Sequence, residues 1–254
     1  MALFINIYWV LMALVVGSFL NVVIHRLPMM IQDHHASQDY NLWYPRSHCP
    51  QCKKTIVWWQ LIPLLGFFLI NRRCHECQEP ISWQYPLVEL TSVILALCIK
   101  MHFGLTIEAG GALLLVWYLI ALFVIDLKHQ VLPDCLTLGL LWIGLLLNTQ
   151  NIFTTLPDAV ISAALAYSVL WLLIHVYALI TGKIGMGHGD FKLFAALAAW
   201  FGLENLPLIL LISSSIGAIT GYIYLKKTQQ SKNTPIPFGP FLCISGVVVL
   251  FTLH

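Results

Sequence analysis

Two pairs of cysteines have the clearest chemical spacing in the sequence. Cys49-Pro-Gln-Cys52 is followed, after 21 residues, by Cys74-His-Glu-Cys77. Two short loops of this kind can present four thiolates to one tetrahedral metal ion, most often zinc. Four sulfur ligands leave no open coordination position, so we expect the ion to be structural. Two disulfides, or four unrelated buried thiols, are the alternatives.

Four carboxylates lie in or beside long apolar runs: Glu89, Asp126, Asp134 and Asp190. A charged carboxylate at the centre of a bilayer costs about 2.5 kcal/mol or more on insertion scales, so each needs a partner, water or a function. Asp126 ends one apolar run and Asp190 begins another. Two runs that end at the same membrane boundary would bring these two side chains to the same face.

A pair of carboxyl groups that shares one proton can perform hydrolysis. The ionised carboxyl activates water and the protonated one polarises the scissile carbonyl, which is the chemistry of an aspartyl protease. A structural interpretation is equally open at this point. Asp126 would then pair with Lys128 or Lys192, and Asp190 would cap a helix N-terminus.

The composition places most of the chain in a membrane. Of its 254 residues 59% are hydrophobic and 9% are charged, against about 25% charged in soluble domains. The net charge of +2 does not suggest binding to nucleic acid. At about 20 residues per span, the apolar runs predict an all-α polytopic protein with about eight transmembrane helices, at residues 3–25, 84–101, 109–127, 131–148, 157–181, 189–203, 205–226 and 236–253.

The positions of lysine and arginine predict the orientation of these helices, because both accumulate in cytoplasmic loops. The first run has no cationic region before it and no small-residue cleavage site, so we expect a retained anchor with its N-terminus outside. With eight spans, only Lys100 then falls on the outer side. Both termini are therefore expected outside, and Asp126 and Asp190 at the cytoplasmic boundary.

The chain is expected to divide into a first transmembrane helix (1–25), a cytoplasmic tetracysteine domain (26–83) and a membrane core (84–254). A reducing cytoplasm argues against stable disulfides, which favours the zinc-ribbon-like interpretation of the four cysteines. Within the tetracysteine domain, residues 58–70 are apolar but too short for a span, and we interpret them as a core or interfacial segment.

Five stretches of the sequence together resemble the bifunctional type IV prepilin peptidases. They are residues 17–28, the paired cysteines, residues 81–90, residues 125–134 and the GxGD-type segment 185–193. The resemblance implies that Asp126 and Asp190 form the protease dyad at the cytoplasmic face of a bacterial inner membrane, with both termini periplasmic. Asp134 matches a recurrent Pro-Asp position with a supporting role, and His188 stands where that family often has tyrosine.

The same resemblance implies the substrates and a second activity. The substrates would be type IV prepilins and pseudopilins, whose processing supports pilus assembly and type II secretion. The second activity is transfer of a methyl group from S-adenosylmethionine to the freed N-terminus. Glu89 is a candidate for holding the substrate ammonium or the cofactor sulfonium, and an interfacial carboxylate with a basic neighbour is the alternative. Gly185, Gly187 and Gly189 would allow an extended substrate segment to approach Asp190.

Three other functions compete with this interpretation. An ion-coupled transporter would use its intramembrane acids as a relay, but it predicts acids near the midplane and paired broken helices. A peptidase of the same fold without the methyltransferase is closer, and the four cysteines favour the bifunctional form. A non-enzymatic assembly scaffold leaves the two aspartates without a purpose.

Overall fold

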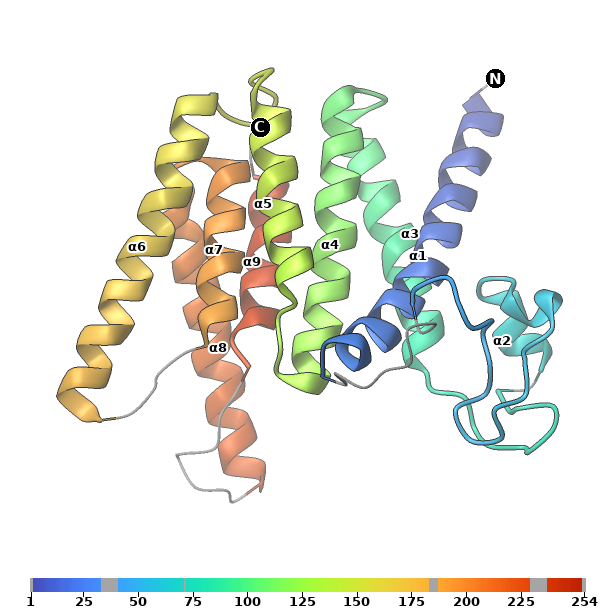
Figure 1. Cartoon of the computed structure of the whole chain (residues 1–254). Coiled ribbons are helices and arrows are strands. Elements are labelled where there is room, and N and C mark those ends of the chain that lie inside the picture. The colour runs from blue at the N-terminus through green and yellow to red at the C-terminus, as the bar shows by residue number, and fades with distance from the viewer. Residues whose placement is uncertain (1, 33–40, 71, 183–186, 229–236, 253–254) are drawn as a thin grey trace. The chain divides into compact units, whose positions relative to one another are not determined.

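The computed structural model describes residues 2–32, 41–70, 72–182, 187–228 and 237–252. The chain forms two compact units, residues 1–105 and 106–254 (Figure 1). Unit 1 contains α1 (Ala2–Gln32), the 3-10 helix η1 (Trp58–Leu61), α2 (Leu65–Leu69) and α3 (Gln84–Phe103). Unit 2 contains α4 (Ile107–His129), α5 (Asp134–Asn148), α6 (Leu156–Thr181), α7 (His188–Phe201), α8 (Leu206–Thr228) and α9 (Gly239–Leu250).

The main contact of unit 1 is the antiparallel pair α1 and α3. Side chains reach backbone carbonyls across the pair at both ends. Trp9 Nε1 donates to the Ala96 carbonyl at 2.8 Å, and Asn21 Nδ2 donates to the Tyr85 carbonyl at 3.1 Å. These hydrogen bonds fix the register of the two helices, because each satisfies an N–H donor that has little access to water.

Gly17 lies at the closest approach between these helices. A Cβ atom at this position would stand 3.0 Å from Glu89 Cα and 3.1 Å from Ser92 Cβ. The Ser92 hydroxyl donates to the Ala13 carbonyl at 2.8 Å, one turn away on α1. A small residue lets the two backbones approach, as is common in membrane helix pairs.

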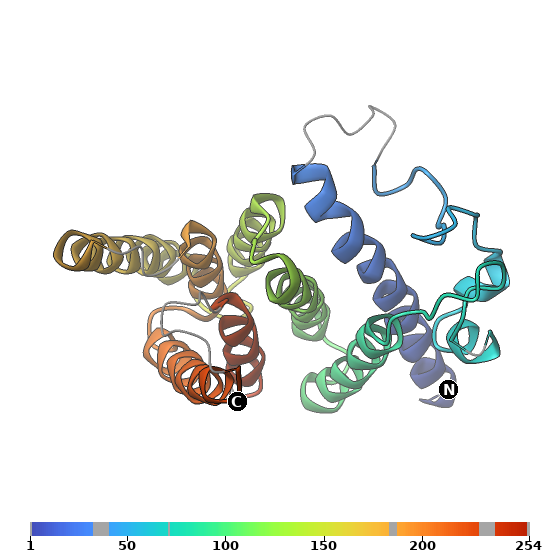
Figure 2. The same ribbon diagram turned by 90° about the horizontal axis from the view of Figure 1, so that it is seen from below.

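Unit 2 is built around α7. Every residue from Phe191 to Phe201 is buried except Lys192, which is partly exposed. A helix that is apolar on all sides must be enclosed by other elements. Helices α5 and α6 flank α7, and α9 contacts it from a second layer. Seen along the helices in Figure 2, α6, α7, α5 and α4 form one row, and α8 and α9 lie beside it.

Trp200 fixes α7 against α5. Its indole N–H donates to the Leu140 carbonyl at 2.8 Å, which satisfies the polar atom of this fully buried ring. A Cβ atom on Gly144 would stand 2.5 Å from the ring, so glycine is the residue that fits there. The Phe153 ring lies 5.3 Å from the same indole, between centroids.

The helices confirm the predicted all-α fold, and all eight predicted runs are found as helices with shifted ends. Five of the described helices, α1, α3, α4, α6 and α8, are long and apolar enough to cross a membrane. Helices α5 and α9 are shorter, and α7 is about 21 Å long at 1.5 Å per residue. Helix α1 continues to Gln32, so the predicted boundary at residue 25 falls inside it.

We predict that Gly17→Val destabilises unit 1, because the added side chain must separate α1 from α3. Overpacking of this kind costs about 1–3 kcal/mol. Thermal unfolding of the purified protein in detergent measures the change. Gly110→Val is the matched control, since a Cβ atom at Gly110 meets nothing within 4 Å. An equal effect of the two substitutions would contradict this explanation for Gly17.

Candidate functional site

Asp126 lies in the last turn of α4. Its carbonyl accepts the Gln130 backbone N–H at 2.9 Å, and Gln130 ends the helix in the left-handed conformation with φ of 53°. The Asp126 side chain is only 5% exposed, although it is close to the end of the helix. Pro133 then precedes α5, so a short connection turns the chain beside the carboxylate.

Asp190 is the third residue of α7. Gly187 is the N-cap of this helix and accepts the Asp190 backbone N–H at 3.2 Å. The Asp190 side chain is 8% exposed. Gly187 holds the N-cap position, and its backbone N–H lies within hydrogen-bonding reach of the Asp190 carboxylate, so the interpretation in which Asp190 caps the helix N-terminus is supported in this form. A carboxylate in the first turn is also favoured by the helix dipole.

The first turn of α9 and the α4–α5 connection bring the two aspartates together. A Cβ atom on Gly239, the first residue of α9, would stand 2.5 Å from Asp126 Oδ2 and 3.2 Å from Leu132 Cδ1. A Cβ atom on Gly189 would stand 2.8 Å from Leu132 Cβ. Leu132 therefore lies beside both Gly239, which is next to Asp126, and Gly189, which precedes Asp190. Asp126 and Asp190 are close enough to interact electrostatically.

The ends of three helices converge on this pair. The last turn of α4 and the first turns of α7 and α9 lie at the same end of unit 2, the lower end in Figure 1. Helix N-termini carry partial positive charge, so α7 and α9 can stabilise negative charge on a buried carboxyl. Two carboxyls held close in a region of low dielectric constant do not both ionise easily.

Asp126 Oδ2 is buried and has no hydrogen-bond partner among the described residues. A buried acceptor without a partner is uncommon, and it points to a partner supplied by water or substrate. No ion pair to Asp126 occurs within the described ranges. The arrangement can therefore bind and deprotonate a water molecule, with a second carboxyl nearby to donate a proton.

Lys192 pairs with Asp134 and not with Asp126. Its ammonium lies 2.7 Å from Asp134 Oδ1 and 2.8 Å from Oδ2. The pair joins the first residue of α5 to the N-terminal part of α7, where Lys192 lies two residues after Asp190. The structural interpretation of Asp126 as a partner of Lys192 is therefore wrong, and the supporting role expected for Asp134 has a defined contact.

The three glycines before Asp190 differ in their surroundings. Gly185 lies outside the described residues. Gly189 is explained by its contact with Leu132, which leaves no room for a side chain. Gly187 is exposed, and a Cβ atom there would stand 3.7 Å from Asp190 Oδ2, an ordinary contact distance. Among the described glycines of this segment, Gly187 is the one at which a Cβ atom would make no close contact with the described residues.

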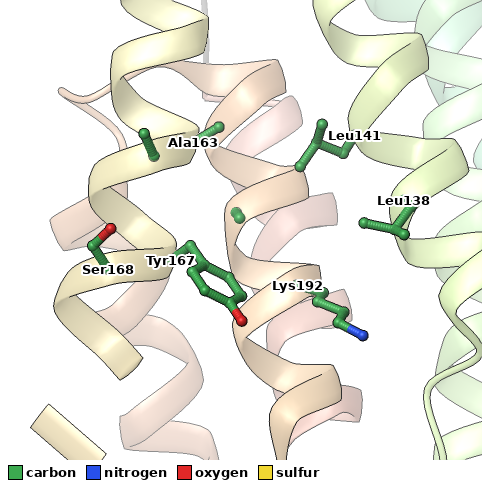
Figure 3. Close-up of a pocket in the computed structure, with 8 residues that line it drawn as sticks. Leu138, Leu141, Ala163, Tyr167, Ser168 and Lys192 are labelled. Atoms are coloured by element: carbon green, nitrogen blue, oxygen red, sulfur yellow. The ribbon is translucent and has the colours of Figure 1, made fainter. Parts of the chain in front are cut away.

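A cavity of about 430 Å³ opens between α5, α6 and α7 (Figure 3). Its lining residues are Leu138, Leu141, Ala163, Ala164, Tyr167, Ser168, Lys192 and Ala195. Neither Asp126 nor Asp190 contributes to the lining, and Lys192 is its one charged residue. The cavity is therefore a neighbour of the carboxylate pair and not the place where the two carboxyls act.

The four cysteines in unit 1 come together as their spacing predicts. Their sulfur atoms all lie within 4.8 Å of one another, and all four are free thiols. The Sγ atoms of Cys49 and Cys77 are 3.7 Å apart, and those of Cys52 and Cys74 are 3.9 Å apart. A zinc–sulfur bond of about 2.3 Å gives a tetrahedron with edges of about 3.8 Å. The donor set therefore fits one zinc ion.

The two cysteine loops have the same backbone structure. In each, the first cysteine donates its N–H to the carbonyl five residues later and accepts the N–H four residues later. The residue after the second cysteine, Lys53 or Gln78, has φ of 57°. Backbone N–H groups of Cys77 and Glu76 lower the pKa of the Cys74 thiol to about 6. A lowered thiol pKa favours the thiolate that a metal requires.

Glu89 lies elsewhere in unit 1, on the buried face of α3. Its Oε2 accepts the Leu64 backbone N–H at 2.7 Å, and the Ser18 side chain is also within hydrogen-bonding reach. The alternative interpretation of Glu89 pairs it with a basic side chain at the membrane interface. Its partner is instead the backbone N–H of Leu64, so that part of the interpretation is wrong. This contact attaches the start of α2 to α3.

Sequence reasoning missed Leu132 and Gly239 as parts of the site. The signal for Gly239 was present, since Gly239-Pro240 is a common beginning for a helix and marks where α9 starts. Its closeness to Asp126 depends on how α9 packs, and no local pattern reports that distance. Leu132 is one leucine among many in an apolar chain.

Family models match both units. Residues 11–103 match the bacterial peptidase A24 N-terminal domain, and residues 113–222 match the type IV leader peptidase family. The gap between the two matches contains the division between the units. No solved structure matches the chain.

Similar curated proteins carry one name, prepilin leader peptidase/N-methyltransferase. The protein of that name from Legionella pneumophila is 51% identical, covering 98% of this chain and 94% of that protein. Those from Pseudomonas aeruginosa and Neisseria gonorrhoeae are 44% and 41% identical, covering 95% and 94% of this chain and 88% and 87% of those proteins. The chain therefore belongs to the type IV leader peptidase family.

Proposed function

We propose that this protein cleaves the leader peptide from type IV prepilins and pseudopilins and then N-methylates the new N-terminal residue. The observation that carries the peptidase activity is the buried pair Asp126 and Asp190 at the converging ends of α4, α7 and α9. The name shared by the relatives supports both activities. Processing of these substrates would serve pilus assembly and type II secretion.

The carboxylate pair would hydrolyse the peptide bond directly. The ionised carboxyl removes a proton from water, and the hydroxide adds to the scissile carbonyl carbon while the protonated carboxyl donates to the carbonyl oxygen. Collapse of this intermediate breaks the C–N bond, and the leaving amine takes a proton from the pair. Asp126 Oδ2 has no partner within the described residues and is a suitable acceptor for the water proton.

The proposed location is the bacterial inner membrane, with both termini periplasmic and the carboxylate pair at the cytoplasmic face. The long apolar helices support a multi-pass membrane protein, and the basic residues support the orientation. A precursor with a cytoplasmic leader and an apolar helix would then present its scissile bond at the depth of Asp126 and Asp190. Its backbone must be extended there, and the exposed Gly187, which has no side chain, would let it approach Asp190.

Cys49, Cys52, Cys74 and Cys77 are proposed to hold one structural zinc ion. The sulfur separations and the paired backbone loops support this proposal. When bound, zinc would join the two loops and hold the tetracysteine domain together. Four thiolates fill its coordination, so it takes no part in peptide hydrolysis.

S-adenosylmethionine is the proposed donor for the second reaction, since N-methylation requires an activated methyl group. The role of Glu89 at that site stays a prediction. Its carboxylate already accepts a backbone N–H from Leu64, so the residue has a structural partner in the absence of any cofactor. We therefore derive no methyl-transfer step through Glu89.

We predict that Asp126→Asn and Asp190→Asn each lower the cleavage rate by about 10²–10⁴-fold, because each removes one proton-handling carboxyl. Cleavage of a prepilin peptide by purified protein, followed by mass spectrometry, measures the rate. Glu204→Gln is the matched control, because this exposed carboxylate lies in the α7–α8 connection, at the other end of α7 from Asp190. Near-normal cleavage by either dyad variant would rule out the assignment.

Removal of zinc is predicted to loosen the tetracysteine domain before it affects unit 2. Metal analysis of protein purified without chelator should give one zinc ion per chain, and Cys52→Ser should lose it. Cys98→Ser, outside the cluster, should keep it. Limited proteolysis would locate the loosened segment. Purified protein without zinc, or with disulfides among the four thiols, would contradict the proposal.

Gly239→Ala is predicted to impair cleavage through Asp126, because the new methyl group would stand 2.5 Å from Asp126 Oδ2. A displacement of about 1 Å at a catalytic group can cost about 10²-fold in rate. Zinc content should be unchanged, since the cysteines lie in the other unit. Gly110→Ala is the control without a neighbour. Cleavage at the normal rate by Gly239→Ala would show that α9 does not position Asp126.

A further inference from the structure

The segment from Trp58 to Leu69 exposes large apolar side chains. We call Trp58 on η1 and Leu65, Phe68 and Leu69 on α2 the apolar face. Their exposed fractions are 76%, 61%, 58% and 64%. Leu65, Phe68 and Leu69 share one side of α2, because residues three and four apart are neighbours on a helix. Large apolar side chains exposed within one short segment are costly in water, and they indicate an interaction surface.

The other side of α2 is firmly packed. Gly66 and Phe67 are buried, and the Phe67 ring lies 5.2 Å from the Trp83 ring, between centroids. A Cβ atom on Gly66 would stand 2.2 Å from the Gln60 carbonyl oxygen, so η1 and α2 meet backbone to backbone. The apolar face is thus the outer side of a rigid hairpin of short helices.

The attachment of α2 to α3 sets its depth in the membrane. Glu89 Oε2 accepts the Leu64 N–H, and Glu89 is the sixth residue of α3. At 1.5 Å per residue this is about 7.5 Å from the start of α3. Helix α3 is one of those long and apolar enough to cross a membrane. In Figure 1, α2 lies level with the lower end of α3, where its span begins.

Aromatic and basic residues complete the surface. The Arg72 guanidinium lies 5.3 Å from the centre of the Trp83 ring, and Arg73 beside it is exposed. Tryptophan is enriched at membrane–water interfaces, and basic residues near the surface are attracted to anionic headgroups. This combination is typical of a segment that lies in the interface plane.

We propose that η1 and α2 lie in the lipid headgroup region, with the apolar face against the acyl chains, and that they anchor the tetracysteine domain to the membrane surface. The occupant of the face is lipid, because the hydrogen bond to Glu89 holds α2 beside a helix that itself meets lipid at that depth. The proposal does not depend on the chemistry at Asp126 and Asp190.

The test uses the full-length protein in nanodiscs of phosphatidylcholine and phosphatidylglycerol, with ordinary lipid or with lipid brominated in the upper acyl chain. Bromine quenches tryptophan that touches the chains. The emission of Trp58 is obtained as the difference between the unaltered protein and Trp58→Phe. We expect brominated lipid to remove most of this emission and aqueous acrylamide to remove little.

Other results would overturn the proposal. Quenching of Trp58 by acrylamide alone would mean that the face is in water. Protection from both quenchers would mean that protein covers it, either unit 2 or another chain. In either case the lipid assignment fails.

A pair of variants gives a second test of the same face, with the Trp58 emission again taken as the difference from the matching Trp58→Phe protein. Leu65→Asp with Phe68→Asp should transfer Trp58 from quenching by brominated lipid to quenching by acrylamide. Gln150→Asp with Asn151→Asp adds the same charge on the exposed α5–α6 connection of unit 2 and should leave the quenching unchanged. Zinc content checks folding in both. Unchanged lipid quenching in the Leu65/Phe68 variant would also overturn the proposal.

Discussion

The burial of α7 is the constraint on which the carboxylate pair depends. From Phe191 onward the helix is apolar on all sides, so α5, α6 and α9 must enclose it. Asp190 precedes this buried stretch by one residue and is drawn in with it. The same enclosure brings the first turn of α9 to Asp126, and the Trp200 indole N–H fixes the far end of α7 on α5. Asp126 and Asp190 are therefore positioned by an apolar core to which neither carboxylate contributes.

Unit 1 attaches a small polar domain to two long apolar helices. Helices α1 and α3 meet closely at Gly17, and Glu89 on the same helix pair holds the start of α2. The four cysteines lie in loops with little apolar core of their own, and small domains of this kind commonly depend on a metal. The tetracysteine domain is thus attached to α3 through Glu89, and the proposed zinc ion would hold its cysteine loops together.

The sequence predicted those features that depend on local spacing. The apolar runs predicted eight helices, α1 and α3 to α9, because an apolar run of this length in a weakly charged chain is typical of a membrane helix. The cysteine spacing predicted the sulfur cluster, because a short loop fixes where two thiolates point. The resemblance predicted the family, which the family matches confirm, and it proposed Asp126 and Asp190 as the dyad, which stays a prediction.

Other features could not be predicted because they depend on packing between distant segments. No local pattern distinguishes Gly239, which lies against Asp126, from Gly110, which meets nothing. The sequence left Lys128 or Lys192 as the partner of Asp126, and the packing of α5 on α7 instead pairs Lys192 with Asp134. Likewise, α7 has the composition of a span, and only the assembled unit reveals it as the enclosed central helix.

We propose that Asp126 and Asp190 share one proton and act as a unit. Infrared difference spectroscopy of the carboxylic acid C=O stretch at neutral pH tests this, by comparing the unaltered protein with Asp126→Asn and with Asp190→Asn. We expect one protonated buried carboxyl whose band is shifted or lost in both variants, because each substitution removes half of a coupled pair. A band that stays the same in either variant would mean that the two carboxyls titrate independently and do not act as a pair.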